Sequence, residues 1–290
     1  MNFSNKTFFI SGGSRGIGLA IALRFAREGA NIVIAAKTEE ARPGLEGTIY
    51  TAAEQIEQAG GKAFPIKCDI RFEDQVETAI DSAAEKFGGI DVLINNASAI
   101  SLTNTLATDI KHYDLMNNIN SRGTFLCSKK AIPYLLKSSH PHILNLSPPL
   151  DMQPKWFKNN TAYAIAKYGM SLCVLGMAAE FENKGIGVNA LWPLTIIATA
   201  AIKNNFGEEY VQKSRTPEIV ADAAYAILKR DPKQCSGNFF IDEEVLKEES
   251  VMDFEKYSYH EGSNQFIADM FVPDSVFSNT KTNLIKAYPE

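Results

Sequence analysis

Short apolar runs alternate along about the first 240 residues with longer stretches in which apolar positions recur at helical spacing. The runs predict strands at 7–11, 31–36, 63–69, 90–96, 142–147, 187–193 and 237–242. Most of these runs are apolar without interruption, so both faces of the predicted sheet should be covered.

The intervening stretches predict helices at 16–29, 51–60, 73–87, about 109–137, about 161–183 and 217–230. Strands that alternate with helices form parallel sheets through right-handed crossovers. The expected fold class is therefore α/β, a Rossmann-type doubly wound parallel sheet with helices on both faces, formed as a single domain over residues 1–242. After Asp242 the composition becomes acidic and aromatic, so residues 243–290 are expected to be an extension that packs on this domain or at a subunit contact.

The composition argues against several classes of binding partner. A net charge of −5 leaves no basic excess for nucleic acid or an anionic membrane surface. No stretch was expected to reach the roughly 18 apolar residues of a membrane span. The beginning of the chain indicates no signal peptide and the end no targeting address, so a cytoplasmic location is expected.

The side chains that often bind metals give no metal site. Cys68, Cys127, Cys173 and Cys235 stand singly, which is typical of reduced core residues. His140 and His142 flank a proline without acidic or thiol neighbours, and they are expected in a loop or at a strand edge.

A glycine-rich turn, SGGSRGIG, follows the first predicted strand and opens the first predicted helix. Glycine lets the backbone approach a pyrophosphate closely, and the helix start offers free N–H groups to it. The candidate cofactor-binding residues of this turn are Gly12, Ser14, Arg15, Gly16, Ile17 and Gly18. A purely structural turn remains the alternative, because glycine spacing alone is a weak signal.

The end of the second predicted strand indicates which nicotinamide cofactor binds. An acidic residue there would bind the ribose hydroxyl of NAD, but the strand ends in Lys37. Lys37 and Arg15 could bind the 2′-phosphate of NADP through charge-assisted hydrogen bonds, so NADP(H) is favoured over NAD(H). The alternative is that Lys37 is simply a solvated residue at the strand end, and the acidic Glu39 nearby leaves this alternative possible.

With this turn, IDVLINNAS, NINSRGTF and YAIAK in this order, the chain resembles the short-chain dehydrogenase/reductase family over about residues 5–242. More narrowly, TIYTAAEQIEQAGGKA, NNASAISLTNTL, ILNLSPPL and VNALWP resemble its hydroxysteroid dehydrogenase-like branch, and the chain is expected to lack the sterol-carrier domain of the animal members.

The resemblance implies roles for several residues. Asp69 and Ile70 would contact the adenine, and Asn95, Asn96 and Ala97 would lie along the cofactor, with Ser98 where the family usually has glycine. Asn120 would hold the water of a proton relay. Tyr163 would be the catalytic acid/base, and Lys167 would bind the nicotinamide ribose.

The spacing of Tyr163 and Lys167 explains how such a pair works. Four residues apart on a helix, the two side chains lie on one face. A free tyrosine has a pKa near 10, and a neighbouring ammonium lowers it by roughly 1 to 3 units. The phenol could then give a proton to a carbonyl oxygen during reduction and take it back during oxidation. An exposed helix pair is the alternative explanation of this motif.

Two positions depart from the family pattern. The residue that aligns with the usual catalytic serine is Pro148, and counting back from Tyr163 along the usual spacing reaches Leu150. A missing oxyanion donor costs roughly 2.7 to 4 kcal/mol unless it is replaced. Ser147 is the preferred substitute, ahead of Ser98 and Thr161.

The second departure follows the sixth predicted strand. The usual Pro-Gly is Pro193-Leu194 here, and Pro193, Thr195 and Thr199 remain candidates for contact with the cofactor. The longer segment before Tyr163 brings Trp156 and Phe157 either to the substrate wall or into the core.

The expected function is an NADP(H)-dependent oxidoreductase that interconverts a secondary alcohol and a ketone or aldehyde of a small lipophilic substrate. A non-catalytic NADP(H)-binding sensor or scaffold is the alternative, and a lyase or epimerase is a third. A homodimer or homotetramer is expected, with 109–137 and 161–183 as candidate contact surfaces.

Overall fold

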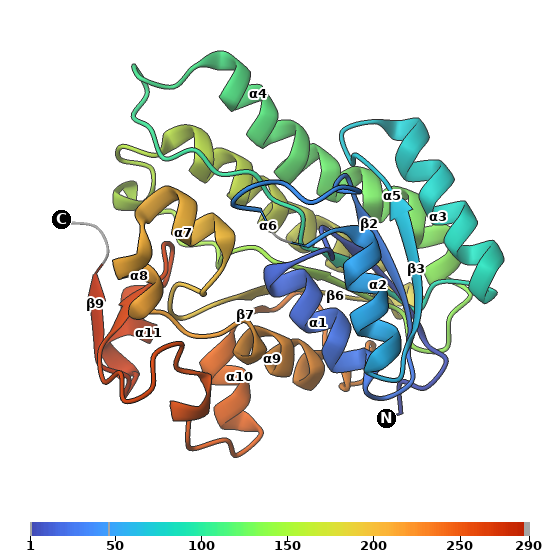
Figure 1. Ribbon diagram of the computed structural model, residues 1–290. Helices are drawn as coiled ribbons and strands as arrows, with labels where there is room; N and C mark the ends of the chain where they lie inside the picture. Colours follow the sequence, from blue (N-terminus) through green and yellow to red (C-terminus); the bar gives the residue numbers. More distant parts are fainter. Residues whose placement is uncertain (1, 46, 287–290) are drawn as a thin grey trace.

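Seven parallel strands form the centre of the molecule (Figure 1). The computed structural model describes residues 2–45 and 47–286. The strands lie in the order β3-β2-β1-β4-β5-β6-β7. Their bounds are Thr7–Ser11 for β1, Asn31–Ala36 for β2, Lys62–Lys67 for β3, Val92–Asn95 for β4, His142–Asn145 for β5, Gly187–Trp192 for β6 and Phe239–Ile241 for β7. The doubly wound parallel fold expected from the sequence is confirmed.

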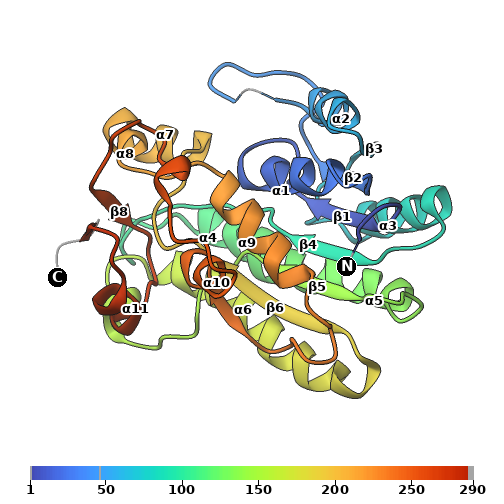
Figure 2. The ribbon, with the colours of Figure 1, turned by 90° about the horizontal axis from the view of Figure 1, so that it is seen from below.

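Helices cover both faces of this sheet (Figure 2). One face carries α1 (Gly16–Ala26), α2 (Ile49–Gln58), α9 (Glu218–Leu228) and α10 (Asp242–Glu248). The other carries α3 (Glu73–Phe87), α5 (Gly123–Leu135) and α6 (Thr161–Phe181). Successive strand residues point to opposite faces, so Phe8 and Ile10 join the first core and Phe9 the second.

The predicted helix at 109–137 is divided in the structure. α4 (Ile110–Asn117) leads through a π-helical turn, Asn118–Arg122, into α5. Such turns place an extra residue in a helix and are frequent at functional sites. The turn contains the buried Asn120.

Short elements that the apolar pattern did not predict follow β6 and β7. α7 (Ala200–Phe206) and α8 (Glu208–Gln212) lie between β6 and α9, and β8 (Phe266–Ala268), α11 (Asp274–Asn279) and β9 (Leu284–Lys286) lie in the C-terminal part. Each is seven residues or shorter, which is too short for a periodic signal.

A buried ion pair ties the C-terminal part to the rest of the chain. The side chains of Arg215 and Glu243 are 3% and 1% exposed, and they pair directly. Glu243 also accepts hydrogen bonds from the hydroxyls of Thr280 and Thr282, at 2.8 and 2.6 Å. Residues close to the end of the described chain are thereby anchored beside α10.

One helix requires a correction to the expected absence of long apolar stretches. Thr161–Lys184 is long and apolar enough to cross a membrane, with a mean hydropathy of 1.3 in its most apolar window. However, 61% of that window is buried inside the domain, because α6 packs on the sheet. The helix is therefore explained as a core helix of the fold.

The cysteines and the two neighbouring histidines lie within the fold. All four cysteines are free thiols, and three of them are buried. His140 and His142 are also buried, with ring centroids 4.6 Å apart. The strand-edge interpretation of His142 is wrong, because it begins β5, which lies between β4 and β6. Within residues 2–45 and 47–286, no group of three or more His, Cys, Asp and Glu residues is arranged to hold a metal ion.

Candidate active site

A cleft of about 950 Å³ opens at the carboxyl ends of the central strands, where doubly wound sheets bind their ligands. The residues predicted from the sequence that line it are Gly12, Ser14, Arg15, Gly16, Ile17, Lys37, Asp69, Ile70, Asn96 and Ala97. Ser98 and Thr199 also line the cleft.

The backbone conformation and close packing of the glycine turn require glycine at three positions. Gly12 and Gly16 have φ angles of +70° and +55°, a backbone region that favours glycine. A Cβ atom on Gly18 would lie 2.5 Å from Asn96 Nδ2 and 2.6 Å from Gly12 O. Gly18 therefore fixes the packing of the turn.

The start of α1 presents its N–H groups without a side-chain cap. Arg15 occupies the N-cap position and forms no capping hydrogen bond. Uncapped N–H groups at a helix N-terminus attract anions such as phosphate. This arrangement, together with the glycine turn, fits a dinucleotide pyrophosphate.

Two side chains hold the turn against β4. Ser11 Oγ accepts hydrogen bonds from the backbone N–H groups of Asn96 and Ala97, at 3.1 and 3.2 Å. Asn96 Nδ2 donates to the carbonyls of Ser11 and Gly12, at 3.1 and 3.0 Å. The sequence reasoning missed Ser11, although it is the polar residue that ends an otherwise apolar strand.

The strand-end residues at the adenosine side carry several charges. Lys37 is 55% exposed, and its Nζ lies 3.7 Å from Asp69 Oδ2. Arg71 donates to both oxygens of Asp69, at distances of 2.6 to 3.1 Å. Burial and the nearby charge of Arg42 lower the pKa of Arg15. Arg42 is thus a further cation near Arg15, in a loop where no sequence motif indicated it.

Tyr163 and Lys167 lie one turn apart on α6, and both are buried. Lys167 Nζ donates to Leu146 O at 2.7 Å and lies 4.9 Å from the centre of the Trp192 ring. Burial lowers the pKa of Lys167 to about 7, and the charge of Asp269 opposes this effect. The pair is therefore not an exposed surface pair.

Asn120 fixes the backbone opposite this pair. Its Nδ2 donates to Ala99 O at 3.0 Å, and its Oδ1 accepts from Ala99 N at 2.8 Å. The side chain is committed to Ala99. The backbone carbonyl of Asn120 accepts from Gly123 N at the end of the π-helical turn.

Ser147 is fully buried, and its hydroxyl oxygen has no hydrogen-bond partner among the described residues. An unpaired buried hydroxyl is costly, so such groups are often reserved for a ligand. Of the other candidate donors, Thr161 donates to Phe157 O at 2.9 Å, and Ser98 lines the cleft.

Buried amides link β4 and β5 to α6. Asn95 Nδ2 donates to Asn145 Oδ1 at 2.8 Å, and Asn145 Nδ2 donates to Met170 O at 3.1 Å. Because Met170 lies one turn after Lys167, these bonds fix α6 relative to β4 and β5. Asn145 was not predicted from the sequence.

Aromatic residues surround Tyr163. Phe271 has a φ of +66° and is fully buried, and its ring centre lies 6.0 Å from that of Tyr163. Trp156 lies 5.9 Å from the same Phe271 ring, and Phe157 stacks on Tyr168 at 5.3 Å. The aromatic residues of the longer segment thus join this cluster.

The residues after β6 pack beneath the C-terminal part. Leu194 N donates to the carboxylate of Asp242 at 2.9 Å. Thr195 is fully buried and forms an isolated antiparallel β-bridge with Ala268. Pro193 and Thr195 lie outside the set of residues that line the cleft, and so do Tyr163 and Lys167.

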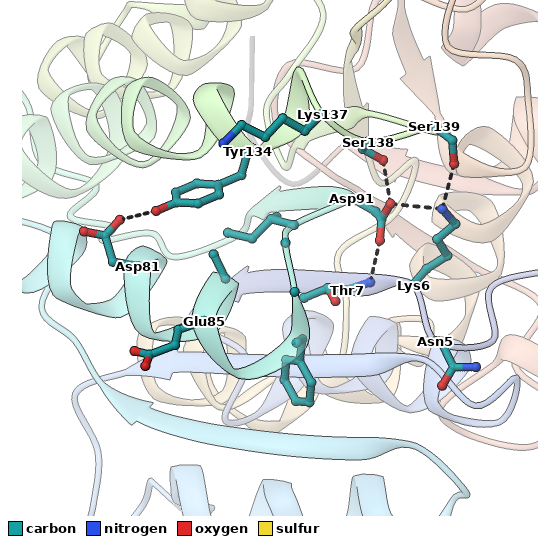
Figure 3. Close-up of a pocket in the computed structure, with 15 residues that line it drawn as sticks. Asn5, Lys6, Thr7, Asp81, Glu85, Asp91, Tyr134, Lys137, Ser138 and Ser139 are labelled. Carbon is teal, nitrogen blue, oxygen red and sulfur yellow. Dashed lines mark hydrogen bonds and ion pairs between the residues drawn. The ribbon is translucent and has the colours of Figure 1, made fainter.

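A second cavity, of about 580 Å³, lies at the amino ends of β1 and β4 (Figure 3). Asp91 accepts hydrogen bonds there from Lys6 Nζ and Thr7 N, at 3.0 and 2.9 Å, and from the Ser138 hydroxyl. These bonds satisfy Asp91, and the cavity is at the sheet edge opposite the glycine turn. It therefore contributes nothing to the candidate active site.

Known proteins similar to this chain support the same interpretation. A family model described as short chain dehydrogenase matches residues 6–209. Hydroxysteroid dehydrogenase-like protein 2 of Xenopus tropicalis is 58% identical over 269 residues, which are 93% of this chain and 64% of that protein. The same-named protein of Bos taurus is 58% identical over 275 residues, which are 95% of this chain and 65% of that protein.

A solved structure shares the fold closely. The crystal structure of a putative dehydrogenase from Xanthomonas campestris is 49% identical, with a TM-score of 0.91 over 94% of this chain and 100% of that chain. The resemblance that the motifs predicted is confirmed. The chain spans slightly less than two thirds of the length of the two curated relatives named above.

Proposed function

Because this chain belongs to the short-chain dehydrogenase family, we propose that it is an NADP(H)-dependent oxidoreductase that interconverts a secondary alcohol and a ketone or aldehyde on a lipophilic substrate. The carrying observation is the buried pair Tyr163 and Lys167 at the carboxyl edge of the sheet, beside a glycine turn with an uncapped helix start. A sensor that only binds a nucleotide needs the turn but has no use for this pair.

The residues present fit a nicotinamide dinucleotide. The turn from Gly12 to Gly18 would hold the pyrophosphate, Lys37 the 2′-phosphate and Lys167 the nicotinamide ribose. When bound, the cofactor supplies or accepts the hydride.

The protein itself handles the proton. Tyr163 gives a proton from its hydroxyl to the carbonyl oxygen during reduction and takes one from the alcohol during oxidation. An ammonium at Lys167 favours the phenolate form of Tyr163 by charge. Ser147 would donate a hydrogen bond to the substrate oxygen, since its hydroxyl is buried and unpaired.

The substrate class follows from the surroundings of Tyr163. Phe271 lies against Tyr163, and Trp156 and Trp192 pack on Phe271 in turn. Apolar walls select apolar ligands. The relatives carry a name that refers to hydroxysteroids, which agrees with a steroid-like or acyl carbonyl compound. We also propose a cytosolic location, which agrees with the four free thiols because thiols stay reduced in that compartment.

The test is to follow the oxidation of NADPH and of NADH by absorbance at about 340 nm, across ketones and aldehydes of increasing apolar size. Turnover of apolar carbonyl compounds supports the proposal. Tight NADPH binding without turnover of any compound would favour the sensor instead.

Lys37→Ala is expected to weaken NADPH binding about tenfold and NADH binding little, because NADPH alone carries a 2′-phosphate for the partly exposed lysine to pair with. Dissociation constants from cofactor fluorescence measure this difference. Lys62→Ala, at the amino end of the neighbouring strand β3, is the control. Equal weakening of both cofactors would rule out the role of Lys37.

We also propose a homo-oligomer formed through the outer faces of α5 and α6. Phe125 is 53% exposed, and Ile165, Leu172 and Leu175 are 42%, 56% and 52% exposed. Exposed apolar residues gathered on neighbouring helices are typical of subunit contacts. Replacing Leu172 and Leu175 together by Lys should yield monomers by light scattering, whereas Met252→Lys should not. A monomeric wild-type protein would contradict the proposal.

A further inference from the structure

Phe271 lies in a backbone conformation that a large side chain rarely adopts. Its φ angle is +66°, in the left-handed region, where the Cβ atom of a bulky residue is strained. The other non-glycine residues with positive φ in the described part of the chain are Asn5, Asn159 and Ser250, whose side chains are small and polar. Such strain persists only where the surroundings hold the residue, and strained residues cluster at functional sites.

Hydrogen bonds on the amino side of Phe271 hold its backbone in place. Trp192 Nε1 donates to Met270 O at 2.6 Å, and Met270 N donates to Asp269 Oδ1 at 2.6 Å. Asp269 N donates in turn to Leu194 O at 3.0 Å. The C-terminal segment 266–272 is thereby fixed to β6 and to the loop that follows this strand.

The fully buried Phe271 ring packs on α6 and on β6 at the same time. Its centre lies 6.0 Å from that of the Tyr163 ring and 5.2 Å from that of the Tyr168 ring, both on α6. On β6 it lies 6.0 Å from the Trp192 ring, and this indole lies 4.9 Å from Lys167 Nζ. Aromatic rings at such distances attract each other. One ring therefore contacts Tyr163 directly and Lys167 through Trp192.

Packing on the Tyr163 ring determines where the phenol hydroxyl lies. A rotation about the first side-chain bond of a tyrosine swings the ring and moves the hydroxyl at its far end. A close-packed neighbour such as Phe271 opposes that rotation, because the interior has no space for the ring to enter. A misplacement of about 1 Å can lower the rate of a reaction by about 10²-fold.

We propose that Phe271 is a positioning residue: its ring, carried by the C-terminal segment, holds the Tyr163 ring so that the phenol hydroxyl faces the reacting oxygen. Phe271 lies beyond residues 6–209, which the short-chain dehydrogenase family model matches, so the support comes from outside that part of the chain. The kinetic consequence rests on the proposed function, because it requires Tyr163 to act as the acid/base. The packing itself can be measured without any substrate.

Phe271→Leu removes the ring and keeps an apolar side chain. Leucine carries a Cβ atom as phenylalanine does, so the backbone strain is the same in both proteins. Phe271→Met, with a flexible side chain that fills irregular gaps, serves as a second variant if Phe271→Leu does not fold.

Phe254→Leu is the matched control. Phe254 also belongs to the C-terminal part, but it packs on the core at the α9 face of the sheet, with its ring 6.4 Å from that of Tyr257. The same chemical change is thus made away from Tyr163. Urea unfolding shows whether the two variants lose similar stability.

The measurement that needs no substrate is carbon NMR relaxation of protein labelled at the tyrosine ring carbons. The Tyr163 signal is identified by its loss in Tyr163→Phe. The order parameter of the Tyr163 ring should fall in Phe271→Leu, because the restraint on its rotation is lost. It should be unchanged in Phe254→Leu. An unchanged order parameter in Phe271→Leu overturns this inference and leaves the proposed function intact.

The kinetic measurement separates positioning from substrate binding. In Phe271→Leu, kcat for carbonyl reduction should fall by about 10- to 100-fold, while KM for the substrate and the dissociation constant of NADPH stay close to wild type. Phe254→Leu should retain the wild-type kcat. An equal fall of kcat in Phe254→Leu, or a raised KM with an unchanged kcat in Phe271→Leu, would contradict the positioning role. If the wild type turns over no carbonyl compound, the proposed function fails, and the NMR result still decides whether Phe271 holds the Tyr163 ring.

Discussion

Tyr163→Phe is expected to lower kcat/KM for carbonyl reduction by about 10²- to 10⁴-fold, the usual contribution of a positioned general acid. The substitution removes the hydroxyl and keeps the ring that packs 6.0 Å from Phe271. NADPH affinity should therefore stay close to the wild-type value. Steady-state kinetics on the best substrate and cofactor fluorescence measure the two effects separately.

Ser147→Ala is the informative companion variant. Its hydroxyl has no partner among the described residues, so its removal should not disturb packing. Because the substitution removes one oxyanion donor, it should cost about 2.7 to 4 kcal/mol of transition-state stabilisation, which would appear as a lower kcat. Wild-type kinetics in Ser147→Ala would contradict the role proposed for Ser147. Wild-type kinetics in Tyr163→Phe would contradict the proposed mechanism as a whole.

Arg215→Met is expected to lower the free energy of unfolding by about 3 to 5 kcal/mol, because it leaves a buried carboxylate without its main countercharge. Arg215 and Glu243 are almost completely buried, whereas Lys247, which also binds Glu243, is 34% exposed. Urea unfolding followed by circular dichroism measures the change. Arg230→Met, which removes an exposed pair with Glu248, should cost about 1 kcal/mol or less.

The double variant Arg215→Met/Glu243→Gln separates pairing from packing. It should lose less stability than Arg215→Met alone, since no unpaired charge stays buried. An equal loss in both variants would mean that the guanidinium acts through packing on Phe254 and Phe266, which it also contacts.

The contribution of the Arg215–Glu243 pair to the free energy of unfolding should change with pH in a defined direction. Burial raises the pKa of Glu243, but hydrogen bonds from Lys247 and Thr282 and the charge of Arg215 outweigh it and leave the pKa at about 2, below the ordinary 4.5. A depressed pKa stabilises the fold above the ordinary value. This contribution is lost as the pH falls from 4.5 to 2. The difference in the free energy of unfolding between wild type and Arg215→Met should therefore become smaller in that range.

Local signals predicted the central sheet and the glycine turn. The helix predicted at 73–87 is found at those residues, because its apolar positions recur regularly and Gly88 ends it in the left-handed conformation. The motif around Tyr163 and Lys167 was equally readable, since four residues form one helical turn. The proposed catalytic roles stay predictions.

Contacts between residues far apart in the chain could not be predicted from the sequence in this way. No periodicity connects Phe271 to α6, and Arg42 belongs to no chemical motif. Burial, which lowers the pKa of Lys167 to about 7, depends on the surroundings that the whole fold provides.

The sequence by itself determined the order of strands and helices, the uncapped glycine turn and the spacing of the acid/base pair, because each depends on residues close together in the chain. Only the tertiary structure decided what surrounds that pair. It holds the C-terminal segment against the loop that follows β6 and brings the Phe271 ring to Tyr163 on α6, and such contacts leave no local pattern.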